Sequence, residues 1–342
     1  MRADSNNFDL LRLLFASVVC VVHAQQLSGQ SDLTVLTLLL SSTVAVKAFF
    51  VVSGYLIFMS YERSSSIWSY AQKRVRRIYP AYFTVVALCA LGMVFASQSS
   101  WRDYFGFAWL KYIVANLAFM NFVKQDLPGV FDANKLNAIN GALWTLKIEV
   151  MFYLSVPLLI FIFRRFGQLR SLVVFYFLSL LYAYLFTELA SLSGRSLYME
   201  LARQLPGQLC YFLAGAFYYF YSPHLQPRMG YLALASVIIL IVDVVFPIPV
   251  LEPFALATLV VFAATYRHLG NFGKYGDFSY GVYIFHFPLI QLLVQYGVLK
   301  DAPWLFLGTA YALTLVGAIA MWHLVEKRFL SRGNHYVFAS LN

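Results

Sequence analysis

The chain has 342 residues, of which 61% are hydrophobic and 12% charged, and its mean hydropathy is +0.69. Many apolar runs reach the roughly 20 residues that cross a hydrocarbon core of ~30 Å, and a soluble fold of this length could not hide so much apolar surface. The net charge of +10 could suggest nucleic acid, but the basic residues lie between apolar runs, which predicts a polytopic membrane protein in contact with lipids and no nucleic-acid partner.

The predicted fold is all-α, a transmembrane helical bundle of about ten spans. Fifteen Lys and Arg residues fall on the side of the two termini and seven on the other side, while Arg12, Lys47 and Lys147 lie within spans. This asymmetry places both termini in the cytoplasm. The spans are predicted at 8–27, 43–61, 79–97, 143–163, 170–187, 205–222, 230–246, 250–266, 278–298 and 304–325.

One apolar segment, FGFAWLKYIVANLAFMNFV at 105–123, is not counted as a span. If it crossed the membrane, the basic residues at 164, 165 and 170 would move to the outer side and every later loop would invert. We therefore expect 105–142 to form an outer interfacial or re-entrant helix followed by a loop, with its aromatic residues in the interface. The polar loop Val123–Gly141 is then a natural rim for an acceptor site.

The first span contains two ionisable residues, Arg12 and His23. Eleven residues of helix make roughly three turns and about 16 Å of rise, so both side chains lie on nearly the same face at different depths. Ionisable groups within a membrane usually face a bundle interior or a water-filled path. The pair therefore suggests an enzyme that accepts a group on one side of the membrane and delivers it to the other.

Short motifs follow one another in a fixed order over nearly the whole chain. They are Arg12 and His23 separated by ten residues, AFFVVSGYLI at Ala48–Ile57, Arg74 and Arg77 ahead of Pro80, LWTLKIEVMFYL at Leu143–Leu154, FSYGVYIFHFPL with Ser279, Tyr280, Tyr283 and His286, and Glu326. Each motif is short, but together they resemble the acyltransferase family 3 membrane proteins of bacteria. Thr145 stands where that family usually has Ser.

The resemblance implies a stand-alone O-acyltransferase of the bacterial inner membrane, with one domain over 1–342. Such an enzyme moves an acyl group, commonly acetyl, from cytoplasmic acetyl-CoA or another acyl-CoA to a hydroxyl of an extracytoplasmic glycan or lipid-linked saccharide. We expect no permanently bound cofactor and no metal. Many members carry a fused SGNH-type domain that completes transfer; we expect none here, so the membrane domain or a partner would complete it.

Arginines near the inner surface are the expected donor-binding residues. Arginine binds phosphate in a bidentate manner, and the resemblance points to Arg74 and Arg77 as ligands of the CoA phosphates. The alternative is a positive-inside anchor on lipid headgroups. Arg12 is expected to bind the donor near the same surface, or else to snorkel to the headgroups. We expect Glu326 to pair with an arginine at the inner end.

Ser279, Tyr283 and His286 recur at spacings of three and four residues, so they share one stripe of their helix. They are expected to line the acyl path or to hold the thioester. Hydrogen bonding between helices is the alternative for all three. This stripe completes the predicted donor-binding set.

The expected catalytic residue is His23. A neutral imidazole can deprotonate an attacking hydroxyl or accept the acyl group covalently, whereas an isolated membrane histidine commonly makes a helix-packing hydrogen bond. A base needs an orienting partner, and Glu149 is the candidate, although it could instead be a counter-ion of Lys47 or Lys147. Either lysine could stabilise the developing oxyanion.

A transporter or flippase of lipid-linked sugars is the rival interpretation of the same embedded charges. Transporters commonly show repeated halves and broken helices near mid-membrane, and the sequence shows neither clearly. The enzyme is therefore the favoured hypothesis. The residues still leave open the acceptor, the length of the acyl chain, a covalent histidine intermediate and the oligomeric state.

Overall fold

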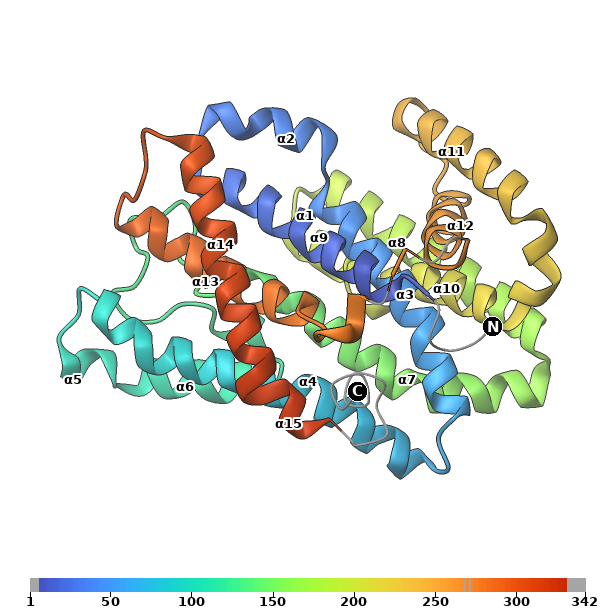
Figure 1. The fold of residues 1–342 in the computed structure, drawn as a ribbon, viewed down its shortest axis with the longest axis horizontal. Helices are drawn as coiled ribbons and strands as arrows, with labels where there is room; N and C mark the ends of the chain where they lie inside the picture. The colour runs from blue at the N-terminus through green and yellow to red at the C-terminus, as the bar shows by residue number, and fades with distance from the viewer. Residues whose placement is uncertain (1–5, 267–268, 271, 331–342) are drawn as a thin grey trace. The chain divides into compact units, whose positions relative to one another are not determined.

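A computed structural model describes residues 6–266, 269–270 and 272–330 of the chain (Figure 1). Within these residues the regular secondary structure is helical throughout, which confirms the predicted all-α class. The α-helices are α1 (Phe8–Ser28), α2 (Thr34–Leu39), α3 (Ser42–Glu62), α4 (Ile67–Gly92), α5 (Trp101–Tyr104), α6 (Phe107–Leu117), α7 (Trp144–Phe166), α8 (Gln168–Ser193), α9 (Ser196–Ala202), α10 (Leu205–Leu225), α11 (Met229–Val245), α12 (Glu252–Thr265), α13 (Ser279–Gln295), α14 (Pro303–Met321) and α15 (Lys327–Phe329).

Seven helical stretches of the described chain are long and apolar enough to cross a membrane. One of them, Ser196–Val245, contains both α10 and α11. Each of the ten predicted spans is occupied by a helix, but α12 and α13 have only 14 and 17 residues. Ten crossings and the cytoplasmic placement of both termini therefore stay predictions, and Arg2, Arg267 and Arg332, three of the basic residues counted for that placement, lie outside the described residues.

Two helix boundaries differ from the predicted spans. Helix α4 begins at Ile67, twelve residues before the predicted span, so the basic residues from Lys73 to Arg77 are helical. These residues are good helix formers despite their polarity, and Pro80 is accommodated inside the helix. Helix α8 continues to Ser193 and ends at Gly194, which adopts the left-handed conformation (φ 66°) that glycine tolerates best at a helix end.

The chain divides into two compact units, each assembled from three segments. The first unit comprises 1–11, 46–71 and 148–271, and the second comprises 12–45, 72–147 and 272–342. Glu149 and Lys47 belong to the first unit. The other predicted site residues belong to the second, which is therefore the unit that carries most of the candidate site.

In the first unit, α3 and α10 approach closely at two glycines. A Cβ atom on Gly54 would lie 1.9 Å from the Phe212 carbonyl oxygen, and one on Gly215 would lie 2.0 Å from that of Val51. Small residues of this kind let helix backbones come together in a membrane protein, where van der Waals packing drives helix association. Beside this contact the Phe152 and Phe212 rings stack at 4.3 Å, and the Phe58 ring lies tilted against Phe212 at 5.6 Å.

In the second unit, α13 and α14 run side by side (Figure 1). Gly281 of α13 permits this packing, because a Cβ atom there would lie 2.7 Å from Cα of Ala318. The segment predicted as interfacial or re-entrant forms α5 and α6, and Trp109 of α6 donates from Nε1 to the Ala90 carbonyl of α4 at 2.7 Å. Helix α6 has 11 residues, about 16 Å of rise, and is too short to span a bilayer.

Candidate active site

Two histidines meet in the second unit, His23 from α1 and His286 from α13. Nδ1 of His23 lies 2.8 Å from Nε2 of His286, and the two rings stack with their centroids 5.1 Å apart. The edge of Phe287 closes one side of His23, at a centroid distance of 5.6 Å. His286 is completely buried, whereas His23 is partly exposed. The sequence interpretation gave these histidines separate roles, and the structure brings them together.

A cluster of alternating charges lies at the N-terminal end of α13. Arg12 of α1 contacts Asp277 at 2.5 Å, and Arg77 of α4 forms ion pairs with both Asp277 and Glu326, the latter at 3.3 Å. The Asp277 carboxylate also accepts hydrogen bonds from the backbone N–H (3.1 Å) and the hydroxyl of Ser279. The prediction that Glu326 pairs with an arginine is confirmed, and that arginine is Arg77.

The Asp277 carboxylate is buried among positively charged groups and hydrogen-bond donors. Its side chain is 1% exposed. Burial alone would raise its pKa, but the Arg12 and Arg77 guanidiniums and the Ser279 donors hold that pKa well below its usual range. Asp277 is therefore ionised and fixes both guanidiniums. Sequence reasoning missed it, although an acidic residue just before a predicted helix start is a recognisable signal.

The three stripe residues of α13 each have a partner. Ser279 donates to Asp277, the Tyr283 hydroxyl lies 2.6 Å from the Thr145 hydroxyl, and His286 contacts His23. The Tyr283 ring stands edge-on to His286 at 5.9 Å. This is the pattern of local and interhelical hydrogen bonding held as the alternative, and it connects the stripe both to Asp277 and to His23. A role in donor binding stays a prediction.

The polar loop between α6 and α7 is held on α13 by amide side chains. Gln291 is fully buried; its Nε2 donates to the carbonyls of Leu136 and Ala138, and its Oε1 accepts from Asn134. Further along the loop, Asn140 donates to the Ile284 carbonyl at 2.8 Å. The predicted rim of the acceptor site is thus an ordered structure anchored to the helix that carries His286.

The remaining predicted residues make other contacts. Glu149 accepts a hydrogen bond from the Tyr153 hydroxyl. Lys47 pairs with Glu252 at 2.7 Å, a carboxylate that also accepts from the Tyr211 hydroxyl and that sequence reasoning missed. Lys147 lies over the Phe122 ring at 4.8 Å. Arg74, one helical turn before Arg77, is partly exposed. The catalytic or donor-binding roles of these residues stay predictions.

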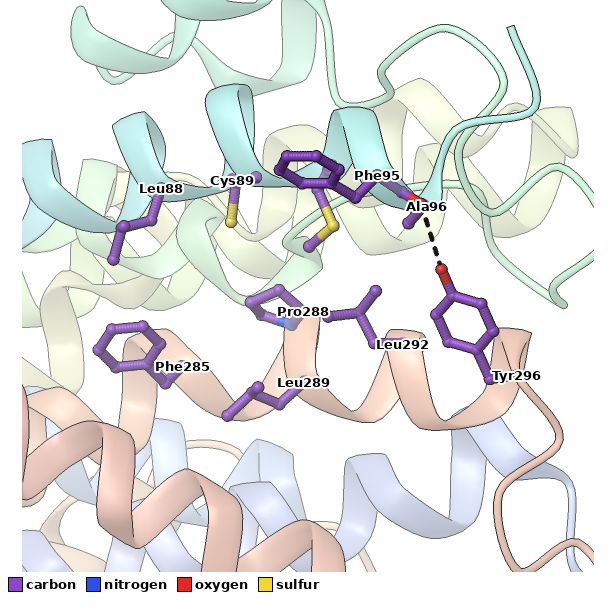
Figure 2. A pocket seen from close by; sticks show the side chains of 11 residues that line it. Leu88, Cys89, Phe95, Ala96, Phe285, Pro288, Leu289, Leu292 and Tyr296 are labelled. Atoms are coloured by element: carbon purple, nitrogen blue, oxygen red, sulfur yellow. Dashed lines mark hydrogen bonds between the residues drawn. The ribbon is translucent and has the colours of Figure 1, made fainter.

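An apolar pocket of about 320 Å³ lies between the end of α4 and α13. Figure 2 shows Leu88 and Cys89 facing Phe285, Pro288 and Leu289 across it. At one end the Tyr296 hydroxyl donates to the Phe95 carbonyl at 3.5 Å. These lining residues suit hydrocarbon, whereas phosphate or sugar groups need the polar partners that the pocket wall lacks.

The titratable side chains suit proton transfer better than metal binding. Across the part of the chain that the structure describes, no three His, Cys, Asp or Glu residues come together to hold a metal ion. A hydrogen-bonded histidine pair can accept and return a proton. The arginines around Asp277 offer planar donors suited to phosphate. The second unit thus combines a histidine pair with an arginine–carboxylate cluster at the other end of α1.

Comparisons with known proteins agree with this chemistry. The chain is 27% identical to nodulation protein 10 of Rhizobium leguminosarum bv. viciae over 94% of this chain and 92% of that protein. It is 27% identical to an O-acetyl transferase of Shigella phage Sf6 over 96% and 97%, and no solved structure matches significantly. The family model described as "Acyltransferase domain" matches residues 5–323. Because that match takes in almost all of the sequence, the chain belongs to this acyltransferase family.

Proposed function

We propose that the protein is a membrane O-acyltransferase that moves an acyl group, here acetyl, from cytoplasmic acyl-CoA to a hydroxyl of an extracytoplasmic glycan. The observation that carries this proposal is the His23–His286 contact, because His23 lies on the same helix, α1, as the Asp277-bound Arg12. Helix α1 would then connect the base, His23, with the arginine that helps to bind the donor, Arg12. The name of the Shigella phage relative, O-acetyl transferase, supports acetyl as the group transferred.

The proposed reaction uses His23 at the acceptor hydroxyl. Its ring takes the hydroxyl proton while the oxygen attacks the thioester carbonyl carbon, so that a C–O bond forms and the C–S bond breaks. The proton then passes to the departing CoA thiolate. In the covalent variant, His23 carries the acyl group between donor and acceptor. Glu149 is proposed to support His23, and Lys47 or Lys147 to stabilise the oxyanion.

The donor is proposed to bind at the arginines around Asp277 and at the neighbouring Arg74. Arg12, Arg74 and Arg77 would contact the CoA phosphates, with Asp277 and Glu326 holding Arg77 in a defined orientation. Tyr283 and the buried His286 would line the path of the acyl group. No cofactor would be permanently bound. The acceptor is proposed to be a glycan or a lipid-linked saccharide reached from the outer face of a bacterial inner membrane.

Replacing His23 with Ala should abolish acyl transfer, because the base is removed while the helix remains intact. The measurement is transfer of label from isotope-labelled acetyl-CoA to glycan in membrane vesicles. His224→Ala, on an exposed histidine of α10, is the matched control and should keep full activity. Unchanged transfer by a folded His23→Ala variant would reject this role for His23.

The same assay separates the enzyme from the rival transporter or flippase. Label appearing on the glycan supports acyl transfer. Movement of a lipid-linked sugar across the membrane with no label attached would support the flippase and overturn the proposed function.

A further inference from the structure

The histidine pair continues into a third group, a backbone carbonyl of α13. Nδ1 of His286 lies 3.1 Å from the Val282 carbonyl oxygen, one helical turn earlier, and Nε2 of His286 lies 2.8 Å from Nδ1 of His23. The result is a line of contacts from carbonyl to imidazole to imidazole. Both ring nitrogens of His286 are used in it, and His286 is completely buried.

The direction of each hydrogen bond in this line follows from the carbonyl. A carbonyl oxygen only accepts, so Nδ1 of His286 must carry the proton. In a neutral imidazole the other nitrogen is then an acceptor, so Nε2 of His286 receives a hydrogen bond from Nδ1–H of His23. His23 is thereby left with its lone pair on Nε2. The opposite tautomer of His23 would place two lone pairs against each other at 2.8 Å.

The remaining nitrogen of His23 is available to a substrate. Among the described residues, none forms a hydrogen bond with Nε2 of His23, and this side chain is partly exposed while His286 is not. Phe287 and Tyr283 flank the two rings with their edges, which restricts rotation. The pair therefore presents one defined basic atom.

We infer that His286 is a positioning residue, which fixes the tautomer of His23 so that Nε2 is the atom that takes the acceptor's proton. This inference rests on the proposed function, and deepens it by assigning the proton to one nitrogen. When Nε2 gains that proton, His23 becomes a cation whose Nδ1–H still donates to Nε2 of His286. A hydrogen bond from a charged donor is stronger than one from a neutral donor, so the contact strengthens as the reaction proceeds.

The first test compares two amide replacements of His286. The carbonyl oxygen of Gln reaches the position of Nε2 and can accept from His23, whereas that of Asn reaches only the position of Nδ1. His286→Gln should keep transfer activity within about tenfold, and His286→Asn should lose on the order of a hundredfold to ten-thousandfold in kcat, the usual contribution of a positioned general base.

The second test reads the tautomer directly and needs no activity. In ¹⁵N-histidine-labelled protein, with His23 assigned by its loss in His23→Phe, the wild-type signal should show a protonated Nδ1 and an unprotonated Nε2. A protonated Nε2 in the neutral wild-type ring would overturn the inference, as would equal loss of activity by folded Gln and Asn variants. Full activity of His23→Ala would instead reject the proposed role of His23 and leave the tautomer result standing, so the two failures are distinguishable.

Discussion

At the scale of single residues, Asp277 holds arginines from two different helices. Arg12 comes from α1 and Arg77 from α4, and the carboxylate between them is almost completely buried. Removing one member of a buried ion pair leaves an uncompensated charge, which is far more costly than breaking an exposed pair. The position of both arginines should therefore depend on this one side chain.

Asp277→Asn should destabilise the protein by about 3 kcal/mol, the lower end of the cost of breaking a buried pair, because Arg12 keeps some contact with solvent. Thermal unfolding in detergent measures the change. The control is Glu200→Gln, which breaks the Glu200–Arg203 pair, where both side chains are more than half exposed, and should cost less than about 1 kcal/mol. Equal effects of the two substitutions would contradict the importance of Asp277.

The sequence predicted which side chains are chemically important better than it predicted which side chains contact them. Arg12 and His23 stand out because ionisable residues are rare in apolar helices. Asp277 lies outside the apolar segment and His286 lies on a distant one, so their contacts with Arg12 and His23 depend on helix packing, which a single sequence does not encode visibly. Glu149 was chosen for its similar depth alone, and depth does not determine which side of a helix faces a base.

At the scale of helices, the α3–α10 contact depends on glycine. Gly54→Ala should destabilise the protein by about 1–3 kcal/mol, the usual cost of overpacking, because the added methyl group meets the rigid Phe212 carbonyl. Gly308→Ala in α14, where a Cβ meets nothing within 4 Å, is the control and should be neutral or stabilising. Thermal unfolding of the two variants compares them, and a neutral Gly54→Ala would contradict this close approach.

The loop 124–140 should depend on Gln291 in a similar way. Gln291→Leu removes the donor for the Leu136 and Ala138 carbonyls, and each unpaired buried group costs about 1–3 kcal/mol. Hydrogen exchange across this loop should then become at least about tenfold faster, since tenfold corresponds to about 1.4 kcal/mol. Gln72→Leu, on an exposed glutamine of α4, should leave the loop unchanged. Unaltered exchange in Gln291→Leu would show that other contacts hold it.

At the scale of the whole molecule, the predicted topology can be tested with cysteine labelling. Cys20, Cys89 and Cys210 are all buried, so background reaction should be low. With both termini in the cytoplasm, a membrane-impermeant maleimide added outside should label Ser191→Cys, after the fifth predicted span. It should not label Ser65→Cys, after the second predicted span, until the membrane is permeabilised. Ser191 and Ser65 are both exposed side chains. The reverse pattern would invert the topology.

Hydropathy located every long helix, because twenty apolar residues leave few alternatives in a chain of this composition. It did not reveal the early start of α4 at Ile67, since charged residues that are good helix formers lower hydropathy without breaking a helix. Nor did it reveal the division into two units, because each unit is assembled from three separated segments. Contacts between distant segments are the information that a single sequence, read alone, does not reveal.

The length of helix α13 sets the distances between the parts of the proposed site. Asp277 precedes the helix, His286 is midway and Gln291 holds the loop 124–140 near its far end. At 1.5 Å per residue, about 14 Å separates the carboxylate position from the histidine, and about 8 Å more separates the histidine from the loop anchor. Under the proposed function, a donor held at the arginines must present its thioester across the first interval, and donors with shorter arms would be rejected by length alone.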